Sequence, residues 1–296
     1  MTLGRGGRGG PGDLFGSSFG GFLRSLLAGI PWSERAEGEQ LLHLEAPGIS
    51  TLRLHNSNGR TCVIGEDRDD VEVKARKVVR AESTEAANQL LDQIRIVSEE
   101  IGDALELEVE IPRKWNRRGH ANVNLRVPRA MSVEVTASNG KIKIEGVRSS
   151  VSAHSSNGSV TIADVIGDIH AETSNAKVAC SCTCGRLLAR SSNGKIEIVE
   201  HRGSVDASTS NGLIRAALEE VAKEGVQLAT SNGRIVLELP DEVDVDVDLR
   251  VDNGFIRNSR SLCKATRERD GQIRGRIGSG GTPIKLRTSN GTISLR

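Results

Sequence analysis

The chain has 296 residues, which is enough for one large domain or two ordinary ones, so a substantial core can form without disulfide or metal staples. Its 40 basic and 39 acidic residues give a formal net charge of +1, which supplies no overall electrostatic reason to bind nucleic acid or an anionic membrane. Aromatic residues are 2% of the chain and tyrosine is absent, so platforms that stack on bases or sugar rings are hardly available. The composition therefore argues against nucleic acid as a partner.

Residues 1 to about 37 form a Gly-rich tail whose composition differs from everything after it. Apolar residues in this tail recur at the spacing of one helical face, from Phe15 through Phe22 to Ile30. Interior glycines each cost about 1 kcal/mol of helix propensity relative to alanine, so the segment is predicted to order only against a partner surface. Docking on its own domain, or disorder, is the favoured interpretation, and membrane contact through residues 15–30 is the alternative.

The sequence contains few features that indicate the cellular compartment of the protein. No apolar run reaches the roughly 20 residues that a membrane-spanning helix requires, and the most apolar N-terminal stretch, 22–30, is broken by Arg24 without a cleavage pattern behind it. The five cysteines are an odd number, and three of them crowd into Cys180, Cys182 and Cys184, a poor layout for a disulfide framework. We therefore expect a protein of the cytoplasm, with peripheral membrane contact as the alternative, and no signal peptide or transmembrane segment.

Residues 38–128 are predicted to be a β-rich region with one helix. Alternating apolar and polar residues mark short strands, as in residues 105–109. Ser83 or Thr84 is a suitable N-cap, and the apolar stripe that follows has helical spacing. The helix is therefore expected to run from about 84 to 93.

Residues 129–296 are dominated by a repeat. The triplet Ser-Asn-Gly occurs seven times in the chain, and Asp-Asn-Gly and Ser-Asn-Ala are degenerate copies. The Asn-Gly pairs are Asn58 and Gly59, Asn139 and Gly140, Asn157 and Gly158, Asn193 and Gly194, Asn211 and Gly212, Asn232 and Gly233, Asn253 and Gly254, and Asn290 and Gly291. From Asn139 the steps between asparagines are 18, 18, 18, 18, 21, 21 and 37 residues, so the last interval holds an insertion at about 258–282. A fixed period of this kind predicts stacked structural units.

Each unit has the pattern of two short strands that meet at the Asn-Gly pair. Apolar residues stand two and four positions after the glycine, as Ile142 and Ile144 do, and a second apolar set with a recurrent alanine follows later in the unit. The pair predicts a sharp corner, because asparagine tolerates the left-handed region and glycine enters positive φ without a Cβ clash. Stacked asparagines are also expected to hydrogen-bond in a ladder.

The Asn-Gly pairs are therefore interpreted as structural turn residues rather than as a catalytic or ligand-binding signature. Antiparallel hairpins also use Asn-Gly turns, so a β-meander is the alternative. The return of like residue types every 18 positions favours a parallel β-helix or β-solenoid, because in-register stacking then puts like on like. The chain ends in the strand "GTISLR", which is expected to be an open end for pairing with another chain or for capping by the N-terminal tail.

The stretches "VNLRVPRAMSVEVTASNGKIKIEGV", "GDIHAETSNAKV", "GSVDASTSNGLI" and "PIKLRTSNGTISLR" resemble the bacterial adhesin-like family of β-strand repeats, domain of unknown function 4097. The resemblance runs from about residue 45 to the C-terminus and depends on the repetition rather than on any single triplet. It implies a β-helical fold, and the family carries no catalytic residues to transfer. Many members carry a signal peptide or membrane segment, and none is recognised in this sequence.

Few residues outside the turns are candidates for chemistry. Cys180 stands where neighbouring units carry isoleucine, so it is interpreted as a small buried hydrophobe. Cys182 and Cys184, with His170 and His201 nearby in the repeat, are weak candidates for a zinc or redox site, because C-x-C-x-C is not a usual structural zinc spacing. No metal and no other cofactor is predicted.

Two charged stretches are interpreted as solvated surface. Asp244, Asp246 and Asp248 alternate along one strand, which sets them on one outward face. The insertion at about 258–282 is rich in arginine and lysine and is expected to be an exposed loop.

The sequence therefore predicts a non-enzymatic scaffold or protein-interaction solenoid of unassigned cellular role, whose partner is another protein or a second copy, assembled end to end. A peripheral membrane accessory of the envelope or its stress response, anchored by residues 15–30, is the second hypothesis. An enzyme built on a β-helix is a remote third, because the outward polar positions contain no evident acid–base pair.

Overall fold

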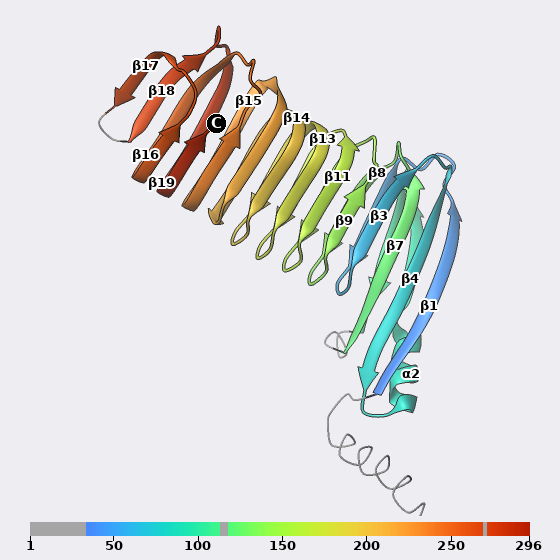
Figure 1. Ribbon diagram of the computed structural model, residues 1–296. Coiled ribbons are helices and arrows are strands. Elements are labelled where there is room, and N and C mark those ends of the chain that lie inside the picture. Colours follow the sequence, from blue (N-terminus) through green and yellow to red (C-terminus); the bar gives the residue numbers. More distant parts are fainter. Residues whose placement is uncertain (1–33, 113–117, 269–270) are drawn as a thin grey trace, which may run out of the picture.

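The computed structural model describes residues 34–112, 118–268 and 271–296 (Figure 1). The predicted apolar stripe of residues 15–30 lies outside the described residues. The first strand begins at Glu34, so the last four residues assigned to the tail belong to a sheet.

Strands make up most of the described chain. The strands are β1 (Glu34–Glu45), β2 (Thr51–Asn56), β3 (Thr61–Glu66), β4 (Asp70–Ala81), β5 (Arg95–Ile101), β6 (Ala104–Glu110), β7 (Gly119–Pro128), β8 (Ser132–Ala137), β9 (Ile142–Glu145), β10 (Val151–Ser155), β11 (Val160–Ile166), β12 (Ile169–Thr173), β13 (Val178–Ser191), β14 (Ile196–Asn211), β15 (Ile214–Glu238), β16 (Val245–Asn258), β17 (Cys263–Glu268), β18 (Gln272–Ile277) and β19 (Thr282–Leu295), and the helix is α2 (Thr84–Gln93).

The strands form two faces that meet at the Asn-Gly corners. Sheet A consists, in spatial order, of β5, β6, β2, β8, β10, β12, the later halves of β13 and β14, the middle of β15, the early halves of β19 and β16, and then β18 and β17. Sheet B consists of β1, β4, β7, β3, β9, β11, the early halves of β13 and β14, the two ends of β15, and the later halves of β19 and β16.

Parallel pairing at a constant offset makes the fold a solenoid. Val151 pairs with Ile169, and Ile169 pairs with Leu187, each 18 residues further along the chain. An antiparallel meander would reverse the direction of neighbouring strands, so these registers confirm the solenoid over its alternative. The predicted fold class, a mainly β solenoid with one short helix in the N-terminal region, is confirmed over the described residues.

The core runs the length of the stack between the two sheets. In sheet B, Ile144, Ile162, Cys180 and Ile198 lie in register and are at most 1% exposed. Burying an aliphatic side chain of this kind stabilises the fold by about 1.5–3 kcal/mol, so each coil adds several kcal/mol only when its neighbours cover it.

Antiparallel strands and the helix close the N-terminal end of the stack. Strand β4 pairs antiparallel with β7, and β1 pairs antiparallel with β4. Helix α2 packs on β1 and β4 (Figure 1). The helix begins where the Ser83 hydroxyl accepts a hydrogen bond from the Ala86 amide, and it buries Ala87 and Leu90.

The coils do not follow one another in chain order at either end. Strands β2 and β3 lie between the β6–β7 coil and the β8–β9 coil, although β6 and β7 come later in the sequence than β2 and β3. The last strand, β19, lies between β15 and β16. The expectation that "GTISLR" is an open end is therefore wrong, because its edges are both paired.

The segment marked as an insertion, 258–282, contains a β-hairpin rather than only a loop. Strand β18 pairs antiparallel with the first half of β16, and β17 pairs antiparallel with β18. Sheet A therefore extends two strands beyond β16 (Figure 1).

The corner glycines are required mainly by the close approach of neighbouring coils. A Cβ on Gly158 would lie 1.7 Å from the carbonyl oxygen of Gly140, a distance that no side chain can adopt. The expectation of positive φ holds at Gly59, Gly254 and Gly291. It is wrong for the other five glycines of the pairs and for every corner asparagine, none of which has positive φ; these glycines are Gly140, Gly158, Gly194, Gly212 and Gly233.

Left-handed backbone gathers instead at a second corner, which follows the sheet B strands. Asp164, Cys182 and Glu200 stand 18 residues apart there and have φ values of 50°, 51° and 54°. Side chains that can adopt this conformation are few, and glycine would be the ordinary choice.

We expect Gly158→Ala to destabilise the protein by at least about 1–3 kcal/mol, because the added methyl group overpacks against the Gly140 carbonyl. The free energy of unfolding, measured by urea titration with circular dichroism, checks this. Gly38→Ala is the matched control, because the nearest atoms to its added Cβ all belong to the flexible Leu91 side chain, the closest at 3.2 Å. Equal losses in the two variants would contradict the explanation.

Candidate functional site

The corner asparagines form one continuous row of hydrogen bonds along the stack. From the second asparagine onward, each side-chain amide nitrogen donates to the asparagine amide oxygen of the preceding coil in the stack, at 2.9 to 3.1 Å, and all the bonds point in the same direction. In spatial order the row is Asn58, Asn139, Asn157, Asn175, Asn193, Asn211, Asn232, Asn290 and Asn253. Aligned hydrogen bonds polarise one another, so the row stabilises the stack more than isolated pairs would.

A second row of hydroxyl groups lies just inside the first. The Thr173 hydroxyl donates to the carbonyl of Gly158 at 2.9 Å, and the Ser155 hydroxyl donates to the carbonyl of Gly140 at 3.0 Å. The same bond recurs at Ser191, Thr209, Thr230 and Thr288. The repeat shows that a small hydroxyl residue recurs here, but the partner carbonyl belongs to the preceding coil and becomes evident only in the stack.

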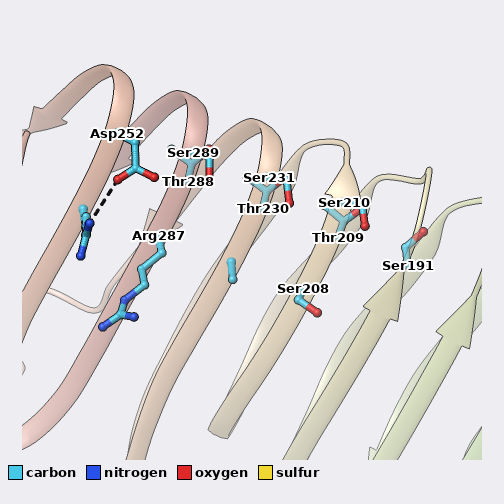
Figure 2. Close-up of a pocket in the computed structure, with 12 residues that line it drawn as sticks. Ser191, Ser208, Thr209, Ser210, Thr230, Ser231, Asp252, Arg287, Thr288 and Ser289 are labelled. Carbon is cyan, nitrogen blue, oxygen red and sulfur yellow. Dashed lines mark hydrogen bonds and ion pairs between the residues drawn. The ribbon is translucent and has the colours of Figure 1, made fainter.

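A polar groove of about 460 Å³ lies on sheet A beside these rows (Figure 2). Its walls are mostly hydroxyl groups and guanidinium groups; the lining residues are Ser191, Ser208, Thr209, Ser210, Ala229, Thr230, Ser231, Arg250, Asp252, Arg287, Thr288 and Ser289. The outward positions in register on β14 and β15 carry only Ser208 and Ala229, whereas the flanking coils carry Arg190 and Arg287. The groove is therefore the gap that two small residues leave between two long ones.

The two arginines that flank the gap differ in how they are neutralised. Arg190 makes a bidentate ion pair with Asp206, at 2.8 and 2.7 Å. Arg250 lies 3.3 Å from Asp252, whereas Arg287 is exposed and has no ion pair with any described residue. Figure 2 shows Arg287 extending from β19 below the row of hydroxyl groups. The groove can therefore offer an anionic group the Arg287 guanidinium, which has no ion pair with any described residue, next to several hydroxyl donors and acceptors.

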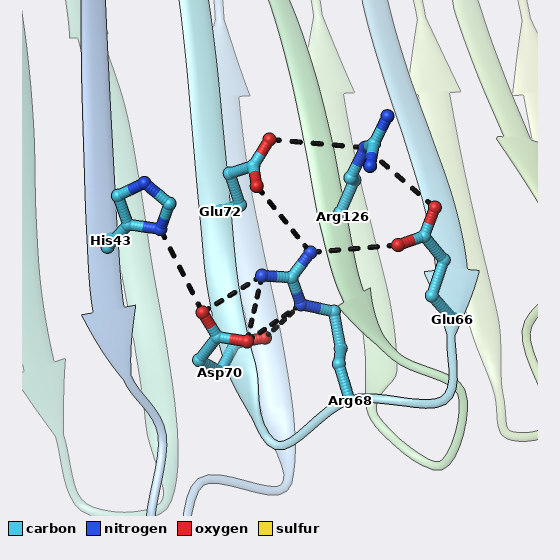
Figure 3. A network of polar contacts seen from close by, with 6 residues as sticks. All are labelled: His43, Glu66, Arg68, Asp70, Glu72 and Arg126. Atoms are coloured by element: carbon cyan, nitrogen blue, oxygen red, sulfur yellow. Dashed lines mark hydrogen bonds and ion pairs between the residues drawn. The ribbon is translucent and has the colours of Figure 1, made fainter.

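A charged cluster lies on the outer face of sheet B near its N-terminal end (Figure 3). The Arg68 guanidinium binds both carboxylate oxygens of Asp70, at 2.8 and 2.9 Å, and lies 3.7 and 3.8 Å from Glu66 and Glu72. His43 of β1 approaches Asp70 at 3.9 Å. Three acids face two arginines here, since Arg126 joins the cluster, so this end of the face is slightly acidic.

The cysteines and histidines suggested for a metal site are not brought together. Cys180 is buried, and burial raises the pKa of its thiol to about 12. The Cys182 thiol donates to Glu200 at 2.9 Å, a hydrogen bond that raises its pKa, and Cys184 is exposed. Among the described residues no group of three or more His, Cys, Asp or Glu could hold a metal ion.

His201 is instead part of a buried polar pair. Its Nδ1 lies 2.9 Å from the Thr183 hydroxyl and its Nε2 lies 3.3 Å from the Ser204 carbonyl, and the side chain is fully buried. Burial lowers the pKa of His201, and the two hydrogen bonds oppose this only in part. In the adjacent coils the same register holds Val165 and Leu218, so the pair interrupts an apolar row.

The acidic stretch at residues 244–248 and the arginine-rich insertion lie next to each other in the structure. Arg276 of β18 pairs with Asp246 at 2.9 Å, and Arg274 pairs with Asp248 at 3.7 Å. Asp244 accepts a hydrogen bond from the Ser279 amide at 2.6 Å. The acidic face of β16 therefore holds the hairpin that closes sheet A.

Parallel two-sided stacking, asparagine corners and antiparallel ends define a β-solenoid-like protein. The sequence matches the profile "Toastrack DUF4097" over residues 52–296, and the chain belongs to this family, as the repeats predicted. No curated protein matches the sequence. No helix among the described residues is long and apolar enough to span a membrane.

Two solved structures are similar to the chain. A "putative cell adhesion protein" from Clostridium sporogenes is 10% identical, with 88% of this chain and 99% of that chain covered and a TM-score of 0.26. A "putative adhesin" from Bacteroides fragilis is 11% identical, with 90% of this chain and 99% of that chain covered and a TM-score of 0.45.

We expect Asn157→Ala to cost roughly twice as much unfolding free energy as Asn253→Ala, with about 0.5–1.5 kcal/mol for each bond lost. Asn157 takes part in two bonds of the row, whereas Asn253, at its end, takes part in one. Urea titrations of the two variants under identical conditions measure the difference. A larger loss for Asn253→Ala would show that the row does not stabilise the stack in this way.

We also expect the stability of the protein to fall as the pH drops from about 7 to 5, partly through His201. The unfolded chain takes up a proton near pH 6.5, which folded His201, with its lowered pKa, does not yet bind. The double variant Thr183→Val with His201→Leu should flatten this dependence, since it restores an apolar row without leaving an unpaired hydroxyl. His120, whose pKa burial also lowers, stays in both proteins, so the difference between their pH profiles isolates His201. Parallel profiles for the two proteins would rule His201 out as a source.

Proposed function

We propose that this Toastrack protein is a non-enzymatic interaction scaffold, whose groove on sheet A receives an extended, acidic segment of a protein partner. The observation that carries the proposal is the uncommitted Arg287 guanidinium beside the gap over Ser208 and Ala229. An exposed cation next to a hydroxyl-lined depression can form charge-assisted hydrogen bonds that its own chain does not supply.

The solenoid supports this role through rigidity. The asparagine row, the hydroxyl row and the close glycine contacts hold the corners in place. The side chains that line the groove therefore stand on strands whose positions are fixed. Neighbouring strands of a sheet are about 4.8 Å apart, so an extended segment that lies across the strands meets hydroxyl groups at regular intervals. Preorganised donors of this kind reduce the entropy that binding costs.

The membrane-accessory alternative depends on residues 15–30, which lie outside the described residues. The enzyme alternative would require an acid–base pair at the site. The charged groups in the groove are two arginines and Asp252, which is paired with Arg250. Binding is therefore the function that we propose.

The test compares the proteins captured by immobilised wild type, Arg287→Ala and Ala229→Tyr. The first variant removes the cation, and the second fills the gap. We expect the same partner to be lost from both variants, with affinity reduced about tenfold or more, because a hydrogen bond to a charged group contributes about 1.5–3 kcal/mol. Quantitative mass spectrometry of the captured proteins identifies the partner, and titration at increasing salt concentration measures its electrostatic share.

Thr161→Tyr, an outward position on sheet B, is the control and should bind like wild type. If no captured protein distinguishes the two groove variants from the control, the groove is not the binding site and the proposal fails.

A further inference from the structure

Sheet B ends abruptly at its C-terminal side. The last half of β16, residues 253–258, pairs on one edge with β19, and no described strand pairs with its other edge. The hairpin of β17 and β18 extends sheet A alone, because β18 pairs only with residues 245–250 of β16. An unpaired edge presents a row of backbone N–H and C=O groups to any strand that can reach it.

This edge also exposes apolar side chains. Phe255 is 74% exposed, and it is the only aromatic residue in the described part of the chain. Ile256 is partly exposed, although Ile293, its in-register partner on β19, is fully buried. Ile256 lacks the next coil that would cover it. Aromatic residues such as phenylalanine are enriched in protein–protein interfaces relative to the rest of the surface.

The other end of sheet B is a matching edge. Strand β1 pairs with β4 and has no described strand on its outer side. Its outward residue Leu41 is 56% exposed, and Leu42 and Leu44 on the inward side are only partly buried. Strand β1 is antiparallel to β4, which is antiparallel to β7, so β1 runs parallel to the coils of the stack. A second copy displaced along the axis would therefore present β1 to β16 as one more parallel strand.

The two edges carry opposite charges. Residues 34–45 contain four glutamates and one arginine, a net charge of −3, and two of these glutamates, Glu37 and Glu39, pair with Arg76 and Lys74 of β4. Residues 253–264 contain Arg257, Arg260 and Lys264 and no acid, a net charge of +3. Arg260 is turned inward and pairs with Asp241, but Arg257 and Lys264 are exposed. Opposite charges of this kind steer two surfaces together and select the head-to-tail orientation.

We infer that the free edge of β16 at residues 253–258 docks on β1 of a second copy of this chain, so that sheet B continues from one molecule into the next. This inference goes beyond the proposed function and is independent of the groove, which lies on sheet A. The assembling edge is therefore β16 and not the last strand of the chain, β19, because β19 is paired on both sides.

One register satisfies both faces of the joined sheet. Phe255 opposite Leu41 places the two exposed apolar residues together on the outer face and Ile256 opposite Leu42 on the inner face. Arg257 then lies opposite His43, beside the slightly acidic cluster that contains Asp70 and Glu72 (Figure 3). The contact is heterologous, so it leaves one free edge at each end and forms an open filament rather than a closed dimer.

The test uses the full chain and two variants that each block one edge. Phe255→Asp blocks the β16 edge and Leu41→Asp blocks β1; both side chains are mostly exposed, so neither change removes buried packing. Ile166→Asp is the control, since Ile166 is 52% exposed and lies on β11, in the middle of the stack. Circular dichroism and thermal unfolding establish that all the variants are folded.

Sedimentation velocity over a range of concentrations gives the result. We expect wild type and Ile166→Asp to form species larger than a dimer as concentration rises, and each edge variant to remain monomeric with an apparent Kd raised about tenfold or more. An equimolar mixture of Phe255→Asp and Leu41→Asp should give a one-to-one heterodimer and nothing larger, because only one free edge of each kind is left.

Three results would overturn the inference. Wild type that stays monomeric up to about 1 mM has no edge contact of useful affinity. Assembly of Leu41→Asp like that of wild type would mean that β16 meets something other than β1. Assembly of Phe255→Asp like that of wild type would mean that the β16 edge is not involved.

Discussion

The structure depends on how closely neighbouring coils approach at the asparagine corner. There the carbonyl oxygen of one coil occupies the space in which a Cβ of the next coil would stand, as between Gly140 and Gly158. Because the backbones are this close, each corner asparagine reaches its counterpart directly, and each inward hydroxyl reaches the carbonyl of the preceding corner. A wider corner would break both rows at once, so glycine, asparagine and hydroxyl residues are required together.

This constraint separates the parts of the chain that hold the stack from the parts that are free to vary. Most inward positions are filled by aliphatic residues and alanine, and the corner residues make hydrogen bonds within the stack. Outward positions make ion pairs of ordinary strength, such as Arg190 with Asp206, or carry small residues such as Ser208 and Ala229. The groove exists because two consecutive outward positions, Ser208 and Ala229, are small, and neither offers Arg287 an ion-pair partner.

The ends of the stack follow a different rule, because a solenoid must cover its last core residues. The N-terminal end is closed by antiparallel strands and by α2, which packs on β1 and β4. The C-terminal end is closed on sheet A by the β17–β18 hairpin, but sheet B stops at β16 and leaves Phe255 and Ile256 uncovered. Among the described strands none pairs with the outer edge of β1 or with the outer edge of β16 at residues 253–258, so sheet B keeps a free edge at each end.

The sequence by itself determined the repeating unit. A period of 18 residues, alternation within each strand and recurring Asn-Gly pairs specify two strands and a corner, because these features depend on residues close in the chain; Ser83 and the stripe behind it likewise specified α2. Only the tertiary structure decided which coils are neighbours. The Asn58 coil lies beside the Asn139 coil across 81 residues, and the Asn290 coil lies between those of Asn232 and Asn253. Identical repeats accept one another in any order, so spacing cannot reveal how the chain is threaded. The same reason hid the groove and the free edge of β16, which are made by coils that the threading brings together or leaves without a neighbour.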